Sequence, residues 1–309
     1  MAALRSSESF AAWTRERTDY MRAHFPWLME EMRGIADALG ETQERIQLLN
    51  LRSWQYREYF SGAESGCASL AIHMKDGAVA CAGALDDPAF IYCGAVQRPA
   101  CEGRFAHITF PIAGTVWASR GLNSEGLSVS ISSQLIRGLQ DDRPSLNQDI
   151  AMRLILESCV TVDDVRAFCA KYAFTMNLVC VDAQGRIVAG HQTEERFFEL
   201  PAESFAVLTN HLVDDAVFDQ IERAGGQVYA SEPTTHYRRG ALLRFARERS
   251  GSCTEEELIA AITDDAQGGR SAVNNPRTYV LTYTLTNRPG RIYICYPSHG
   301  ENVFTEVIL

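Results

Sequence analysis

The sequence lacks the features that mark membrane-spanning, metal-binding and disulfide-stabilised proteins. No apolar run approaches the roughly 18 residues of a membrane span, and residues 1–15 show no basic segment followed by an apolar stretch, so we expect a cytoplasmic protein. The nine cysteines are an odd number and include no C-x-x-C pair, which favours reduced thiols over a disulfide framework. The seven histidines show no H-x-x-x-H spacing and no grouping with cysteine, so we expect neither a metal site nor a cofactor.

Positive charge is also scarce. The 309 residues include 29 lysines and arginines against 39 aspartates and glutamates, which gives a net charge of −10. Nucleic acids and anionic membranes are bound chiefly by clusters of lysine and arginine, which the sequence lacks, so we expect neither as a partner. With 46% hydrophobic and 22% charged residues, the chain has the composition of a soluble globular protein of one large domain or two small ones.

Two kinds of hydrophobic periodicity divide the chain. Apolar residues recur at helical spacing through residues 8–51, with breaks near Pro26 and Gly40. From Cys67 the pattern changes to short β runs, which we predict at 67–75, 78–85, 105–110, 114–119 and 126–133. Further helices are predicted at 147–159, 162–172, 213–224, 237–249 and after Thr254, and further strands at 176–183, 187–191, 205–209, 278–286 and 291–297. This order predicts an α+β protein, either two stacked antiparallel sheets covered by helices or a plain α+β domain.

Gly66-Cys67 lies where the helical pattern gives way to the β pattern. If the peptide bond between these residues were cut, Cys67 would carry a thiol nucleophile and a free α-amine on one residue. An α-amine has a reference pKa of about 7.7–8.0, which suits a general base at neutral pH. The alternative is a half-buried strand cysteine that acts as a small hydrophobic residue.

Four later segments contain residue types that suit acyl-transfer chemistry. They are Gly83-Ala84-Leu85-Asp86, Gly121-Leu122-Asn123-Ser124-Glu125-Gly126, Val207-Leu208-Thr209-Asn210-His211 and Thr234-Thr235-His236-Tyr237-Arg238-Arg239. A carboxylate could hold the ammonium of a new N-terminus, an asparagine amide could donate to an oxyanion, and a guanidinium could lower the pKa of a nearby thiol. Each segment also has a structural interpretation: a turn aspartate, a hairpin turn, a helix cap and solvated helix arginines.

In this order, the Gly-Cys pair and the four segments resemble the N-terminal-nucleophile (Ntn) cysteine hydrolases of the acyl-coenzyme A:6-aminopenicillanic acid acyltransferase and choloylglycine hydrolase group. The resemblance covers most of the chain and implies a four-layer αββα sandwich of two antiparallel sheets. It also implies that residues 1–66 are a helical propeptide, that the chain cuts itself between Gly66 and Cys67, and that residues 67–309 form the catalytic domain.

The resemblance implies a catalytic role for three motif residues besides Cys67. Asp86 matches the carboxylate near the amine of the nucleophile, with Asp87 as the alternative. Asn210 matches an asparagine whose amide forms part of the oxyanion hole. Arg238, in preference to Arg239, matches an arginine that lies near the nucleophile and its carboxylate.

Other positions are less closely matched, and two depart from the family pattern. The hairpin leads to an oxyanion or substrate position at Ser132 or Ser133, where an asparagine is commoner and a serine hydroxyl reaches less far. His211 is expected to lie in the pocket or on the surface rather than act as a base. Gly83 stands where the family has an arginine, and Ala68 replaces the usual hydroxyl residue after the cysteine, so cleavage and substrate choice are expected to differ in this member.

The implied activity is that of a self-processed hydrolase of linear amides, with an N-acyl amine or an amino-acid amide as the small-molecule substrate and a thioester on Cys67. Transfer of the acyl group to an amine, or from acyl-coenzyme A, is the first alternative. A thiol amidase that works uncleaved and a non-catalytic binding protein that keeps the fold are the others. The propeptide is expected to stay bound after cleavage, and the protein could form a homo-oligomer.

Overall fold

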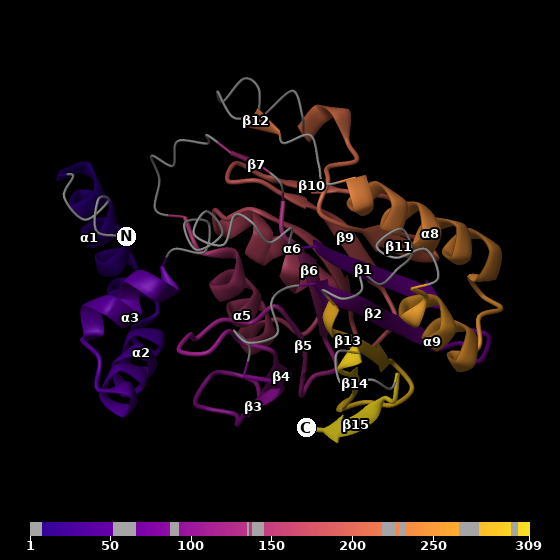
Figure 1. Ribbon diagram of the computed structural model, residues 1–309, viewed down its shortest axis with the longest axis horizontal. Helices are drawn as coiled ribbons and strands as arrows, with labels where there is room; N and C mark the ends of the chain where they lie inside the picture. The colour runs from indigo at the N-terminus through magenta and orange to yellow at the C-terminus, as the bar shows by residue number, and fades with distance from the viewer. Residues whose placement is uncertain are drawn as a thin grey trace.

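Two antiparallel β-sheets form the centre of the molecule, and helices lie outside both of them (Figure 1). The computed structural model describes residues 8–51, 66–86, 93–134, 136–137, 145–217, 227–228, 233–265, 278–297 and 302–309. The first sheet has six strands, in the order β11 (Phe205–Leu208), β1 (Gly66–His73), β2 (Val79–Asp86), β13 (Thr278–Leu285), β14 (Arg291–Cys295) and β15 (Thr305–Ile308). The strand that begins at Gly66 therefore lies inside this sheet, between β11 and β2.

The second sheet has seven strands. Their order is β10 (Phe197–Glu199), β9 (Ile187–Gln192), β8 (Met176–Val181), β6 (Ser128–Ser132), β5 (Arg120–Asn123), β4 (His107–Thr109) and β3 (Val96–Arg98). A separate pair joins β7 (Ile136–Arg137) to β12 (Gln227–Val228). Every pairing in these sheets is antiparallel, both between strands that follow one another along the chain and between strands far apart in it, such as β2 and β13.

Helices complete four layers. The second sheet packs against α5 (Gln148–Ser158) and α6 (Val162–Lys171) through one hydrophobic cluster, and the first sheet packs against α8 (Pro233–Arg249) and α9 (Glu255–Thr263) through another. Two smaller clusters lie between the sheets. The αββα sandwich predicted from the sequence is confirmed.

The sequence of β6 shows why this strand has one apolar and one polar face. Successive side chains of a strand point to opposite sides, and in Ser128-Val129-Ser130-Ile131-Ser132 the apolar residues alternate with serines. Val129 and Ile131 join the cluster under α5, whereas Ser128 and Ser130 hydrogen-bond to hydroxyl groups of the first sheet. Polar contacts therefore link the two sheets where hydrophobic ones would be usual.

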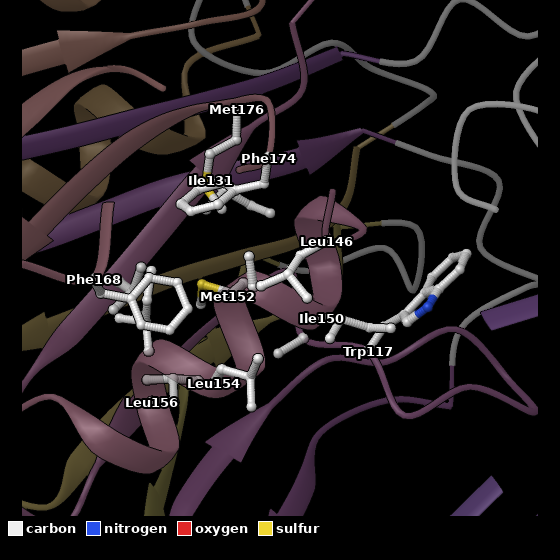
Figure 2. Close-up of a cluster of buried hydrophobic side chains, with 14 of the residues drawn as sticks. Trp117, Ile131, Leu146, Ile150, Met152, Leu154, Leu156, Phe168, Phe174 and Met176 are labelled. Atoms are coloured by element: carbon white, nitrogen blue, oxygen red, sulfur yellow. The ribbon is translucent and has the colours of Figure 1, made fainter. Parts of the chain in front are cut away.

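The N-terminal segment forms three helices that pack on the sandwich. They are α1 (Glu8–His24), α2 (Pro26–Leu39) and α3 (Gln43–Asn50), with breaks where Pro26 and Gly40 predict them. Leu28 and Met32 of α2 belong to the same buried cluster as Trp117 and residues of α5 and α6. Figure 2 shows part of this cluster, in which Ile150, Met152, Leu154 and Leu156 of α5 lie below Ile131 and Met176 of the second sheet. The N-terminal helices therefore share the core of the sandwich.

Asn50, at the end of α3, joins the N-terminal helices to the sandwich by hydrogen bonds. Its side chain is fully buried; Nδ2 donates to Gly114 O (3.2 Å) and Oδ1 accepts from Val116 N (2.7 Å). Its carbonyl accepts from Trp117 Nε1 and from Asn147 Nδ2, both at 2.9 Å. Four bonds from one residue thus satisfy buried polar groups on the far side of this contact.

Local signals placed most helix starts correctly, but one predicted strand is wrong. Thr161 and Thr254 each form a capping box, with Asp164 and Glu257 respectively. Residues 114–119 are not a strand, because the backbone N–H groups of this segment bond outside the sheets, for instance Val116 to Asn50 and Ala118 N to Asp149 O. Much of the helix predicted at 213–224 lies outside the described residues.

Candidate active site

Antiparallel pairing gathers the predicted site residues at one end of the sandwich. Strand β1 starts where β2 ends and where β13 starts, so Gly66 pairs with Asp86, and Asp86 pairs with Thr278. Asn210 follows the end of β11, which pairs with β1 on its other side. Residues far apart in the chain therefore meet around Gly66-Cys67.

Cys67 points into the space between the two sheets. It is 5% exposed and belongs to a cluster with Leu85 of β2 and with Ile108 and Phe110 of the facing sheet. Its backbone N–H donates to Asn210 Oδ1 at 2.8 Å. Its carbonyl oxygen accepts from Arg238 Nη1 at 2.5 Å. The backbone on both sides of the thiol is thus held by predicted site residues.

Asn210 is the centre of the hydrogen-bond network. Its Oδ1 accepts from Cys67 N and from Arg238 Nη2 (3.2 Å), and its Nδ2 donates to Ser133 O (3.0 Å). Its own N–H donates to Thr235 Oγ1 at 3.0 Å. The side chain connects the two sheets and does not serve as the helix cap that the sequence left open.

Arg238 and Asp86 form a buried ion pair beneath Gly66. Both side chains are fully buried, and Arg238 Nη1 lies 3.5 Å from Asp86 Oδ2. Thr278 Oγ1 donates to Asp86 Oδ1 at 2.7 Å. A Cβ atom on Gly66 would lie 2.5 Å from Arg238 Nη2 and 3.0 Å from Asp86 Oδ2, so the pair leaves room only for glycine. Burial of opposite charges requires such close pairing, since an isolated buried charge is costly.

Ser132 ends β6 on the opposite sheet, and Ser133 follows it. Ser132 Oγ lies 3.3 Å from Ser69 Oγ of β1, two residues beyond the cysteine. The carbonyl oxygen of Ser133 accepts from Asn210 Nδ2, and its hydroxyl oxygen accepts from Gln148 Nε2 at 2.8 Å. Both serines are buried next to the site, and a serine hydroxyl can donate as well as accept a hydrogen bond.

The three remaining predicted residues differ in position. Arg239 lies outside the network around Cys67, since its Nε donates to Val207 O at 3.3 Å. His211 borders the site, with Nδ1 3.0 Å from Thr235 Oγ1, and its ring lies 4.0 Å from that of His236. Burial, then His236 and Arg239, lower the pKa of His211 to about 3, so it is neutral at pH 7. Asp87 lies outside the described residues.

The structure adds supporting residues that the sequence did not suggest. Asn177 Nδ2 donates to Thr209 O (2.7 Å), next to Asn210, and Asn177 Oδ1 lies 2.6 Å from His191 Nδ1. His191 Nε2 accepts from Val213 N at 3.1 Å, so Nδ1 carries the proton and donates to Asn177. Burial lowers the pKa of His191 to about 4. A neutral histidine therefore fixes the backbone on both sides of Asn210, at Val213 directly and at Thr209 through Asn177.

Among the described residues, no group of three or more histidine, cysteine, aspartate and glutamate side chains is placed to hold a metal ion. No helix in the described ranges is long and apolar enough to cross a membrane.

A family model decides the relationship of this chain to known proteins. The model for acyl-coenzyme A:6-aminopenicillanic acid acyl-transferase matches residues 85–253, more than half of the chain. The chain belongs to this family. The matched residues of the chain include Asp86, Asn210 and Arg238 and begin after Cys67.

Solved structures confirm the fold of this acyl-transferase family member. The conjugated bile acid hydrolase of Clostridium perfringens is 12% identical, with a TM-score of 0.56 over 79% of this chain and 92% of that one. An orthologue of N-acylethanolamine-hydrolyzing acid amidase from Caenorhabditis elegans is 16% identical, with a TM-score of 0.50 over 79% of this chain and 100% of that one. No curated protein matches the sequence. These likenesses confirm the predicted fold, which this chain shares with a bile acid hydrolase and an acid amidase.

Proposed function

We propose that this protein is a self-processing cysteine amidohydrolase in which Cys67 becomes the N-terminal nucleophile. The hydrogen bond from Cys67 N to Asn210 Oδ1 carries this proposal. It holds the nitrogen that would become the α-amine against the side chain assigned to the oxyanion hole. The ion pair of Arg238 and Asp86 lies against the residue that would leave.

Maturation proceeds by an N-to-S acyl shift. The Cys67 sulfur attacks the carbonyl carbon of Gly66, the new C–S bond replaces the C–N bond, and the thiol proton passes to the freed amine of Cys67. Water then hydrolyses the thioester, which gives a carboxylate on Gly66 and restores the thiol. The guanidinium of Arg238, beside Gly66, is placed to stabilise the negative charge of that carboxylate.

Turnover of a linear amide uses the same atoms. The α-amine of Cys67 accepts the thiol proton as the sulfur attacks the substrate carbonyl, and then gives that proton to the leaving amine. A thioester remains on Cys67 until water cleaves it. An amide nitrogen carries two hydrogens, so Asn210 can bind Ser133 O with one and the tetrahedral oxyanion with the other. The hydroxyl groups of Ser132 and Ser133 are the second source of donors.

The N-terminal fragment stays bound after cleavage in this proposal, with residues 1–66 as propeptide and 67–309 as catalytic domain. Several polar contacts from α2 support it, because Glu31 pairs with Arg98 and Arg153, and Trp27 Nε1 donates to Glu157 Oε2 at 3.0 Å. The shared hydrophobic core adds to them. Release of the fragment would expose this core to water, which is unfavourable.

Acyl transfer is the second candidate, because the matching family model bears the name of an acyl-transferase. Both reactions pass through a thioester on Cys67 and differ only in whether water or an amine accepts the acyl group. For the hydrolase, the expected substrates are N-acyl amines and amino-acid amides.

Amine release from a panel of these amides tests the proposal. We expect activity in the wild-type protein and none in Cys67→Ala. Cys81→Ala is the matched control, since Cys81 is also buried between the sheets and burial raises the pKa of its thiol to about 12. The Cys81 variant should keep its activity.

Two results would contradict the proposal. Activity that persists in Cys67→Ala would exclude Cys67 as nucleophile. No amine release, combined with alkylation of Cys67 no faster than that of the exposed Cys93 and Cys101, would favour a non-catalytic binding protein. Addition of an amine acceptor separates the two candidate reactions, because a transferase forms a new amide and a hydrolase forms the free acid.

A further inference from the structure

A layer of hydroxyl groups lies between the sheets next to Cys67. Ser69 Oγ of β1 lies 2.8 Å from Ser130 Oγ and 3.3 Å from Ser132 Oγ, both of β6. Since side chains alternate along a strand, Ser69 and Cys67 project from the same face of β1. The surroundings of the thiol are therefore polar on the side toward Ser69.

Arg120 enters this layer from the second sheet. Its side chain is 1% exposed, among the largest fully buried side chains of the described residues, and it pairs with Ser130 in the β5–β6 ladder. Its Nη2 crosses to the first sheet and donates to Ala84 O of β2 at 2.7 Å. Arginine is always protonated in proteins, so this position holds a permanent positive charge between the sheets.

Gly83 makes space for that guanidinium. A Cβ atom on Gly83 would lie 2.7 Å from Arg120 Nη1, 3.1 Å from Ser130 Oγ and 2.2 Å from the carbonyl oxygen of Ala68. Any side chain at position 83 would thus collide with the backbone of β1 and with Arg120. The guanidinium of Arg120 in β5 therefore fills the space that a side chain at position 83 of β2 would take.

The strand register places this charge beside the nucleophile. Ser69 pairs with Gly83, Ala68 with Ala84 and Cys67 with Leu85. The guanidinium, which contacts the backbone at Gly83 and Ala84, is therefore one to two residue pairs from Cys67, on the face from which its sulfur projects.

We propose that Arg120 stabilises the thiolate of Cys67, with its guanidinium supplied from β5 into the space that Gly83 leaves in β2. This role rests on the proposed function, in which Cys67 is the nucleophile. The proton lost by the sulfur passes to the Cys67 amine, and Arg120 itself exchanges no proton. Arg120 is a positioning and electrostatic residue rather than a proton donor.

Other charged or titratable groups lie near Cys67 and have to be separated from Arg120. Asp86 and Cys81 come from β2, Arg238 from α8 and Tyr279 from β13. Arg238 donates to the Cys67 carbonyl and pairs with Asp86. A substitution of Arg120 leaves that pair in place, so its effect on the thiol can be measured alone.

The test is the pH dependence of alkylation of Cys67 by iodoacetamide, followed on the Cys67 peptide by mass spectrometry. In Arg120→Gln and Arg120→Met, the midpoint of the rate profile should rise by about one pH unit or more, the size of shift that a neighbouring opposite charge produces. Arg120→Lys keeps the charge and should restore a midpoint near that of the wild type. Arg153→Gln, which removes an equally buried arginine far from the thiol, should lower thermal stability and leave the midpoint unchanged.

The outcomes separate this proposal from the one on which it rests. If wild-type Cys67 reacts no faster than the exposed Cys93 and Cys101, the nucleophile itself is wrongly assigned. If wild-type Cys67 reacts fast and the midpoint stays unchanged in folded Arg120→Gln or Arg120→Met, only the role of Arg120 is wrong. If both neutral variants fail to fold while Arg120→Lys folds with a midpoint unlike the wild type, Arg120 serves folding alone, and the proposal is overturned.

Discussion

Replacing Asn50 by alanine should destabilise the protein where the N-terminal helices meet the sandwich. The alanine loses the acceptor of Val116 N–H, a fully buried group, and the donor to Gly114 O. A buried N–H without a partner costs about 1–3 kcal/mol, and the second bond contributes about 0.5–1.5 kcal/mol. The carbonyl of residue 50 keeps its bonds to Trp117 and Asn147. The free energy of unfolding should therefore fall by about 2–4 kcal/mol.

Urea unfolding and thermal unfolding measure this loss, which should appear as a decrease in Tm of roughly 4–10 °C. Asn287→Ala is the control, because Asn287 bonds to Asp76 at the surface, and its loss should change stability by less than about 0.5 kcal/mol. In processed protein, Asn50→Ala should also weaken retention of the N-terminal fragment in gel filtration. Equal stability of the Asn50 and Asn287 variants would refute the claim that α3 is bonded into the core.

Substitutions at three other positions should separate processing, turnover and stability. Gly66→Ala places a Cβ 2.5 Å from Arg238 Nη2 and should slow cleavage by up to about a hundredfold in a gel time course. Gly34→Ala, with no atom within 4 Å of its Cβ position, is the control and should cleave normally. Equal cleavage rates in the two variants would contradict the crowding at Gly66. Asn210→Ala should lower kcat for amide hydrolysis about a hundredfold or more, and an unchanged kcat would remove Asn210 from the oxyanion hole. His191 has a folded-state pKa of about 4, below its usual 6.5, so its contribution to the free energy of unfolding is fully present above pH 6.5. That contribution falls by about 1.4 kcal/mol per pH unit as the pH drops from 6.5 toward 4. His191→Gln should reduce that slope in Tm measured from pH 7.5 to 4.5. His107 and His211, whose pKa values are also lowered by burial, to about 4 and about 3, keep part of the slope. An unchanged slope would contradict the buried neutral state of His191.

The fold was predictable because local patterns determine most of its elements. Capping boxes at Thr161 and Thr254 mark helix starts within the sequence itself. Residues 114–119 misled the prediction because their apolar pattern suits a strand, yet the N–H of Val116 bonds to Asn50, 66 residues earlier. No local pattern encodes a partner at that distance. The short edge strand β15 gave no signal of its own.

The candidate site was predictable only in part, for a related reason. The order of motifs identified Cys67, Asp86, Asn210 and Arg238, which the structure brings together. The same motifs showed that Gly83 departs from the family pattern, and left the departure unexplained. Arg120 could not be connected with Gly83 from sequence, since only the stacking of the two sheets brings β5 against β2.

Intact-mass measurement of the purified protein tests the central claim most directly. The account predicts two fragments that meet at the Gly66–Cys67 bond, the second of which begins with a free cysteine amine, and a single full-length chain in Cys67→Ala. A wild-type protein that releases amines from amides while its chain stays whole would contradict the claim that Cys67 acts as an N-terminal nucleophile.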